Sequence, residues 1–155
     1  MLRVTRLTDY ATVVLTVLAA EPGRVLSAVD LADRAGLEPP TVSKVLRPLA
    51  QAGLVEAFRG AHGGYRLSRP PEEISLIAIV EAMEGPLAMT ECSLDDASCG
   101  IASQCGARAN WRRINDIVAD ALRGVSLAQM LEAPAPDPGA GPVAPRRIPA
   151  RLATV

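Results

Sequence analysis

The sequence predicts a mainly α-helical fold with one short β-hairpin, and three observations support this prediction. Apolar residues make up 49% of the 155 residues but aromatic residues only 3%, so aliphatic side chains must fill the core. Apolar positions recur at helical spacing in several segments. Only residues 54–70 have the pattern of two short strands around a glycine-rich turn.

The N-terminal segment predicts a first helix over residues 8–20. Tyr10, Val14 and Leu18 recur at helical spacing, and Thr8 is the predicted N-cap. A proline–glycine pair follows this segment and ends the helix.

The next two segments predict a helix-turn-helix. Ser27 and Asp30 form a capping box at the start of residues 27–37. A longer helix begins near Pro40, carries an apolar stripe and ends at Gly53, which suits the C′ position. Pro48 interrupts this stripe, so the helix either bends there or ends earlier than the stripe suggests.

The predicted hairpin over residues 54–70 completes a winged helix. Gly63 and Gly64 are expected to supply the positive φ angles of its turn. Another short helix follows over residues 74–85. A helix pair followed by a hairpin is the order of a winged helix-turn-helix.

The C-terminal part predicts a long amphipathic helix over residues 108–124 and one further turn that Ser126 and Gln129 cap. Its apolar stripe has few partners in so small a first domain, which makes it the expected seam of a homodimer. The alternative is that the stripe packs on the winged helix of its own chain. The stripe consists of Trp111, Ile114, Val118, Ala121, Leu122 and Val125. From Ala133 onward, proline, alanine and glycine dominate without periodicity, which predicts a disordered tail. The expected boundaries are a winged helix over 1–86, a cysteine loop over 87–107, a dimerisation helix over 108–131 and a tail over 132–155.

The charge distribution permits, but does not by itself establish, a phosphate-binding surface in the N-terminal half. Residues 1–71 carry nine basic and six acidic residues, whereas residues 72–132 carry four and ten. No apolar run is long enough to span a membrane, and the N-terminus lacks a secretory signal, so we expect a cytoplasmic protein. The sequence contains no nucleophile–base pair or phosphate loop, so we do not expect an enzyme.

Polar and cationic side chains on the second helix of the pair and on the wing are the candidate DNA contacts. A helix of this kind enters the major groove, and a wing contacts the minor groove or the backbone. The alternative is that these are ordinary solvated positions, and for His62 an exposed turn residue. The candidates are Thr41, Ser43, Lys44, Arg47, Arg59, His62 and Arg66.

Three cysteines, Cys92, Cys99 and Cys105, lie within fourteen residues and are the only ones in the chain. An odd number excludes a closed set of disulfides, and in a reducing compartment such a group favours metal binding or redox chemistry. The spacing lacks the Cys-x2-Cys pairs of zinc ribbons. It suits an iron–sulfur cluster with a fourth ligand from elsewhere, and equally a redox-sensing set of thiols.

The combined motifs resemble a known family. LTDYATVVL, the wing RGAHGGYRL, ISLIAIVEAMEG, the three cysteines, NWRRI and GVSLAQM occur in one order over residues 1–131. This order is similar to that of the IscR/NsrR-type regulators, which are dimeric, iron–sulfur-sensing winged-helix transcription regulators of bacteria. The segments RGAHGGY and EGPLAMTEC look closest to regulators of the SUF iron–sulfur assembly operon.

The resemblance implies that Cys92, Cys99 and Cys105 ligate a 2Fe–2S or 4Fe–4S cluster. In the IscR type, a histidine three residues after the third cysteine completes the site, but this chain has Arg108 there, and a guanidinium is not an ordinary iron ligand. In the NsrR type, an aspartate from the first helix of the partner chain does so, and Asp9 matches it. The alternative for Asp9 is a carboxylate favoured by the helix dipole.

The implied function is repression of iron–sulfur assembly genes from a palindromic operator in double-stranded DNA, as a homodimer and without a membrane. The competing hypotheses are a thiol-based redox or nitric-oxide-responsive repressor without a resident cluster, and an interaction module that uses the winged helix as a scaffold.

Overall fold

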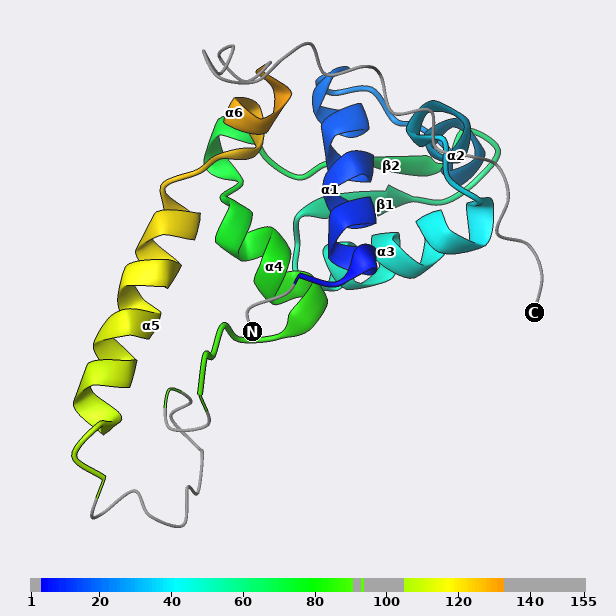
Figure 1. Cartoon of the computed structure of the whole chain (residues 1–155). Helices are drawn as coiled ribbons and strands as arrows, with labels where there is room; N and C mark the ends of the chain where they lie inside the picture. Colours follow the sequence, from blue (N-terminus) through cyan, green and yellow to red (C-terminus); the bar gives the residue numbers. More distant parts are fainter. Residues whose placement is uncertain (1–3, 91–92, 94–104, 133–155) are drawn as a thin grey trace, which may run out of the picture.

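Helix α1 (Arg6–Ala19) lies at the centre of the fold and packs against four of the five other described α-helices, all except the one over residues 108–123 (Figure 1). The computed structural model describes residues 4–90, 93 and 105–132. The remaining elements, in chain order, are α2 (Ala28–Ala35), α3 (Pro39–Gln51), β1 (Val55–Phe58), β2 (Gly64–Leu67), the 3-10 turn η1 (Pro71–Glu73), α4 (Leu76–Glu84), α5 (Arg108–Arg123) and α6 (Leu127–Leu131). The fold is mainly helical with one antiparallel strand pair, as the sequence predicted.

The core consists of aliphatic side chains. Among the described residues, every buried hydrophobic side chain is Ala, Val, Leu or Ile, and these come from α1, α2, α3, α4, α6 and the strand region. The low aromatic content therefore corresponds to a core that small and branched side chains fill. None of the described helices combines the length and the apolar character that a bilayer crossing requires.

The start of α1 differs from the prediction. The N-cap is Thr5, whose hydroxyl accepts from the Thr8 amide at 3.4 Å, and Thr8 lies inside the first turn with 1% of its surface exposed. The Thr8 hydroxyl instead donates to the carboxylate of Glu84, a residue at the end of α4. The assignment of Thr8 as N-cap was wrong: the helix begins one turn earlier, with Thr5 as its cap, and the Thr8 hydroxyl has a distant acceptor that the local sequence does not show.

The helix-turn-helix follows the predicted caps. The Ser27–Asp30 capping box is present at α2, and Gly36 ends that helix in the left-handed region at φ 65°. Helix α3 continues through Pro48 to Gln51. The helix therefore extends to the end of its apolar stripe and does not end early at Pro48.

The C-terminus of α3 has the geometry of a Schellman motif. Gly53 adopts φ 69°, its amide donates to Ala50 O at 3.1 Å, and the Leu54 amide donates to Leu49 O at 2.9 Å. The prediction that Gly53 ends this helix is confirmed, and the motif turns the chain directly into β1.

The wing is an antiparallel pair in which Phe58 faces Gly64 across a connection of residues 59–63. The positive φ of the turn, 109°, belongs to Gly60 and not to Gly63 or Gly64, so that assignment was wrong. At both predicted glycines, backbone atoms of another residue lie too close to leave room for a side chain. A Cβ on Gly63 would lie 2.5 Å from the Phe58 carbonyl oxygen, and one on Gly64 would overlap the carbonyl of Leu26.

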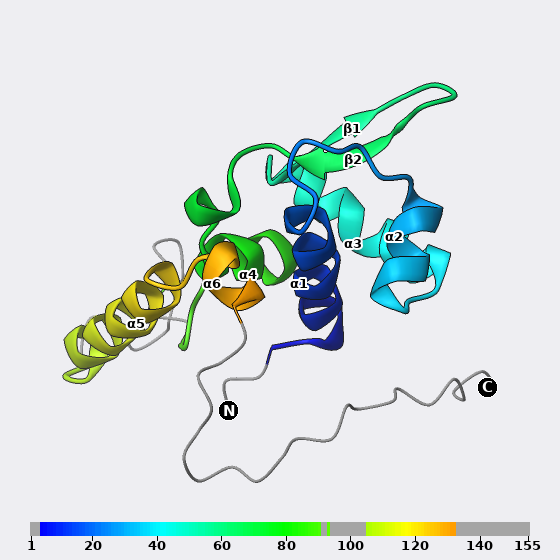
Figure 2. The same ribbon diagram turned by 90° about the horizontal axis from the view of Figure 1, so that it is seen from above.

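Helices α5 and α6 divide the C-terminal segment. The Ser126–Gln129 capping box is present and starts α6, whose Leu127 is fully buried against the winged-helix core. Backbone hydrogen bonds from Leu76 N to Val125 O (2.8 Å) and from Leu127 N to Ile74 O (2.7 Å) tie this junction to the first domain. Helix α5 itself has no buried residue and projects from the rest of the fold (Figure 2).

Candidate nucleic-acid interface and metal centre

Helix α3 separates its buried and exposed side chains as a groove-reading helix would. Its apolar stripe is buried in the core, whereas Ser43, Lys44 and Arg47 are exposed and Thr41 is partly exposed. The Ser43 hydroxyl donates to Pro39 O at 3.0 Å, which leaves its oxygen free to accept. The structure therefore brings four predicted contact residues onto the accessible side of one helix.

The wing holds the other three predicted residues, but in two different settings. Arg59 and His62 are exposed in the connection between the strands. Arg66 lies on β2, where its guanidinium forms an ion pair with Glu56 at 3.0 Å and stacks over the Phe58 ring at 4.8 Å. The tip therefore offers two groups to a nucleic acid, whereas Arg66 already has protein partners.

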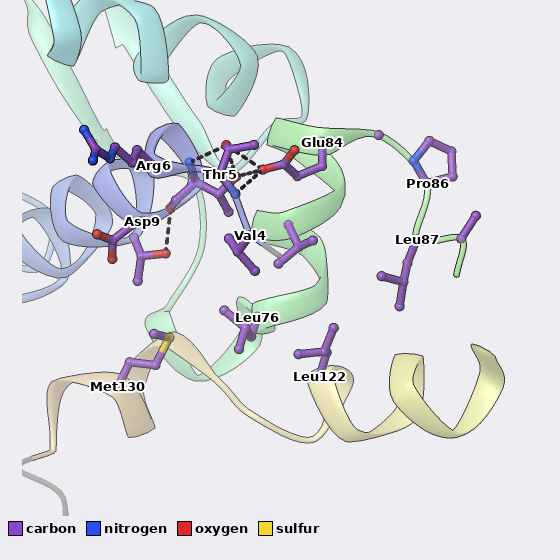
Figure 3. Close-up of a pocket in the computed structure, with 15 residues that line it drawn as sticks. Val4, Thr5, Arg6, Asp9, Leu76, Glu84, Pro86, Leu87, Leu122 and Met130 are labelled. Carbon is purple, nitrogen blue, oxygen red and sulfur yellow. Dashed lines mark hydrogen bonds between the residues drawn. The ribbon is translucent and has the colours of Figure 1, made fainter. Parts of the chain in front are cut away.

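A largely apolar groove of about 610 Å³ lies where the start of α1, the end of α4 and the α5–α6 junction meet (Figure 3). Its walls include Val4, Leu76, Leu87, Leu122 and Met130. Sequence reasoning missed this groove, because its walls come from segments far apart in the chain.

Glu84 lines this groove from the end of α4. Its Oε1 accepts from Thr5 N at 3.0 Å, from Thr5 Oγ1 at 2.6 Å and from Thr8 Oγ1. These hydrogen bonds, with the Thr5 side chain first, lower the pKa of Glu84 from its usual value. The carboxylate thus caps α1 from another helix, a role that no local motif in the sequence indicates.

Asp9 also lines the groove, from the first turn of α1. It is exposed, and its side chain points away from Glu84 in Figure 3. The position is accessible to a second chain and is also one that the helix dipole favours for a carboxylate. Both interpretations of Asp9 from the sequence are compatible with this placement.

The cysteine segment is only partly described. Cys92 and Cys99 lie outside the described residues, whereas Cys105 is a free, half-buried thiol three residues before α5 begins. In the described part of the chain, no three His, Cys, Asp or Glu side chains converge as a metal site.

Two observations agree with a thiolate-bound centre near this thiol. Cysteine thiolates are the usual donors for an iron–sulfur cluster, and Cys105 is a free, half-buried thiol. The Nε of Arg108, one turn after Cys105, is buried and has no hydrogen-bond partner among the described residues. An unpaired donor of this kind suits an electron-rich sulfur acceptor.

Comparison with known proteins gives consistent matches over most of the chain. A family model described as "Rrf2: Iron-dependent Transcriptional regulator" matches residues 4–133. The chain is 30% identical over 114 residues to the HTH-type transcriptional regulator IscR of Aliivibrio salmonicida, covering 74% of this chain and 67% of that protein. It is 34% identical over 109 residues to the HTH-type transcriptional regulator NsrR of Bacillus subtilis, covering 69% and 75%.

A solved structure matches the fold as well as the sequence. The structure of CymR, the global cysteine regulator of B. subtilis, superposes with a TM-score of 0.65 at 30% identity and covers 84% of this chain and 97% of that one. Three differently named regulators therefore share this chain's sequence pattern or its fold.

Proposed function

Because this chain belongs to the Rrf2 family of transcription regulators and is not an enzyme, we propose that it is a DNA-binding repressor of iron–sulfur assembly genes that responds to a bound iron–sulfur cluster. Rrf2 regulators bind DNA, so double-stranded DNA is a partner of this protein. Its place of action is then the cytoplasm, where bacterial DNA lies.

One observation carries the sensing part of the proposal. The cysteine segment connects α4 with α5. Helix α4 is hydrogen-bonded to the start of α1, whereas α5 buries none of its residues and exposes an apolar stripe. A change in this segment would act at the junction between the DNA-reading domain and the exposed helix. That is the position a sensor requires.

DNA reading follows from the outward face of α3 and the wing tip. Lys44 and Arg47 suit guanine edges or phosphates, and Thr41 and Ser43 suit bases or phosphates in the major groove. Arg59 and His62 at the wing tip suit the minor groove or the backbone. Arg66 stabilises the wing through its ion pair with Glu56, so we expect it to contribute less to DNA binding than Arg59 and His62.

The exposed stripe of α5 supports a homodimer. Trp111 and Ile114 are each 39% exposed and lie about one turn apart on α5, so they form part of a contiguous apolar surface of the kind that marks an interaction site. Pairing two such helices by a two-fold axis would place two α3 helices against the half-sites of a palindromic operator.

Cys92, Cys99 and Cys105 would hold the cluster, and Asp9 of the partner subunit would complete the ligand set. We do not expect Arg108 to ligate; its Nε is buried and has no hydrogen-bond partner among the described residues, so it would be available to donate to a sulfur of the site. When bound, the cluster supplies a centre whose presence depends on iron, sulfide and oxidants.

A second candidate function is a thiol-based repressor without a resident cluster. It is favoured by the similarity to CymR, which is described as a global cysteine regulator, and by the half-buried free thiol of Cys105. In that case oxidation of the thiols themselves would change DNA binding.

Anaerobic purification followed by iron and sulfide analysis separates the two functions. The proposal expects a coloured protein with about two or four irons per chain and matching sulfide. A colourless, iron-free protein whose operator binding changes on oxidation would establish the thiol-based function instead. Operator affinity of the holo and apo forms must be measured at one salt concentration, because phosphate contacts alone shift affinity steeply.

A further inference from the structure

The segment over residues 85–90 leads from α4 towards the cysteines, and a turn stands at each of its ends. Gly85 turns the chain out of α4 with φ 86°. Beyond it, the Ser93 amide donates to Thr90 O at 2.9 Å, and the two hydroxyls lie 2.9 Å apart. The segment therefore begins and ends in defined backbone turns.

Glu84 fixes the first end of the segment to α1. Its carboxylate accepts from the backbone and the hydroxyl of Thr5 and from the hydroxyl of Thr8, across 79 and 76 positions of sequence. Hydrogen bonds to an ionised acceptor are stronger than neutral ones. The last residue of α4 thereby holds the first turn of the helix that also carries Asp9.

Asn115 fixes the second end of the segment to α5. Its Oδ1 accepts from the Met89 amide at 3.1 Å, and its Nδ2 donates to the Leu87 carbonyl at 3.3 Å. One side-chain amide thus satisfies a donor and an acceptor of the same extended stretch, as a neighbouring strand would. Asn115 lies near the middle of α5, beside the exposed apolar stripe.

We propose that Glu84 and Asn115 are positioning residues that tie residues 85–90 to α1 and α5, so that a displacement of this segment moves the DNA-reading domain relative to α5 within the same chain. The tie itself stands on the described hydrogen bonds. Its use in sensing rests on the proposed function.

A purely local structural role of Asn115 and the proposed link between α1 and α5 predict different effects when Asn115 is replaced. If Asn115 only stabilises the local backbone, its loss loosens residues 87–89 and nothing else. If the segment transmits strain between the two helices, its loss also loosens the first turn of α1, which Asn115 does not touch. Amide exchange distinguishes the two cases, because it reports local opening residue by residue.

The test uses the full chain with all three cysteines changed to serine, so that no cluster contributes. In this background, Asn115→Ala is expected to speed amide exchange over residues 5–9 by at least about threefold, a fraction of what loss of one hydrogen bond produces. Asn115→Asp keeps the acceptor for Met89 and is expected to give an intermediate rate. Asn110→Ala, on the exposed part of the same helix, is the matched control and should leave these rates unchanged.

Faster exchange confined to residues 87–89 and α5 would overturn the proposed link. If the Ala variant is globally less stable, which denaturant unfolding followed by circular dichroism detects, the exchange pattern of the Asp variant decides the test. Glu84→Ala should loosen residues 5–9 directly and, through the segment, residues 87–89, while Glu81→Gln on the exposed side of α4 should loosen neither.

Operator binding with the native cysteines tests the use of the link. Allosteric effects of this class change affinity about 5- to 150-fold. We expect Asn115→Ala to retain iron and sulfide but to reduce the holo-to-apo affinity ratio to less than about a third of the wild-type ratio. An unchanged ratio in a cluster-bearing variant would remove the sensing role. If the wild-type ratio is itself one, the proposed sensing function fails, while the exchange result still decides whether the link exists.

Discussion

At the scale of single residues, the glycines of the wing show how closely the backbone segments approach. Gly64 is buried, and a methyl group there would overlap the Leu26 carbonyl, with which β2 exchanges hydrogen bonds through Tyr65. The requirement is for space and not for an unusual φ angle, which is why the sequence alone misassigned it.

We therefore expect Gly64→Ala to destabilise the protein by about 1–3 kcal/mol, because backbone atoms cannot move aside as a flexible side chain can. Urea unfolding followed by circular dichroism measures this change. Gly106→Ala is the control, since a Cβ there has no neighbour within 4 Å, and its effect should stay within about 0.5 kcal/mol. Equal midpoints for the two variants would contradict this account of the wing.

Glu84 gives a pH dependence whose sign follows from its hydrogen bonds. The Thr5 side chain, and then Thr8, lower the pKa of Glu84 in the folded state below its ordinary value of 4.5. A lowered folded-state pKa means that the stabilisation is complete above the ordinary value and is lost as the pH falls through the folded-state value.

The stability difference between wild type and Glu84→Gln should therefore shrink as the pH falls through the ordinary value of 4.5 and on through the lower folded-state value. Asp30, whose pKa the Ser27 side chain lowers, contributes with the same sign. It is present in both proteins, so its contribution cancels in the comparison. Thermal unfolding at a series of pH values measures the difference, and a difference that stays constant over this range would show that Glu84 carries no such contribution.

At the scale of secondary structure, the helices were predictable where their signals are local. The capping boxes at Ser27 and Ser126 and the terminating Gly53 are confirmed, because each involves residues only a few positions apart. The N-cap of α1 was assigned to Thr8 instead of Thr5, because both threonines suit a cap and the sequence does not show that the Thr8 hydroxyl donates to Glu84 of another helix. The same reason explains why Glu84 and Asn115 were missed as site residues: both act on backbone or hydroxyl groups distant in sequence.

Helix α3 carries a prediction for DNA binding. Lys44→Ala should weaken operator binding by about 1–3 kcal/mol if it contacts a base, or reduce the slope of affinity with salt by about one if it contacts a phosphate. Fluorescence anisotropy at several salt concentrations measures both quantities. Arg123→Ala on α5, where the arginine pairs with Asp120, is the matched control and should bind like the wild type.

Helix α5 carries a prediction for assembly. Ile114→Glu places a charge on the exposed apolar stripe and should convert a dimer to a monomer, with little loss of helix content because no α5 residue is buried within one chain. Light scattering after size-exclusion chromatography measures the mass. Arg113→Glu, a neighbouring exposed position off the stripe, should remain dimeric, and a monomeric wild type would refute this use of α5.

At the scale of the whole molecule, the last described helix completes the first domain. Leu127 of α6 is fully buried beside α1 and Ile74, so the core includes residues from both sides of the projecting α5. The sequence predicted the final helical turn from its capping box. It did not predict that this turn packs on the core, because the sequence of so short a helix does not indicate which surface it covers.

Leu127→Ala should cost about 2–5 kcal/mol, the usual range for a leucine removed from a closed core. Denaturant unfolding gives this value. Leu131→Ala is the control, since Leu131 lies on the same short helix and is 40% exposed. Similar losses for the two variants would show that α6 is not part of the cooperative core.

The position of α6 also has a consequence for biosynthesis. Contacts between α1 and α6 join parts of the chain more than one hundred residues apart, so a nascent polypeptide cannot close its hydrophobic interior until translation has passed Leu127. Premature termination anywhere before that codon would leave aliphatic surface open to proteases. Chains truncated before Leu127 are therefore expected to be degraded faster than chains that include α6.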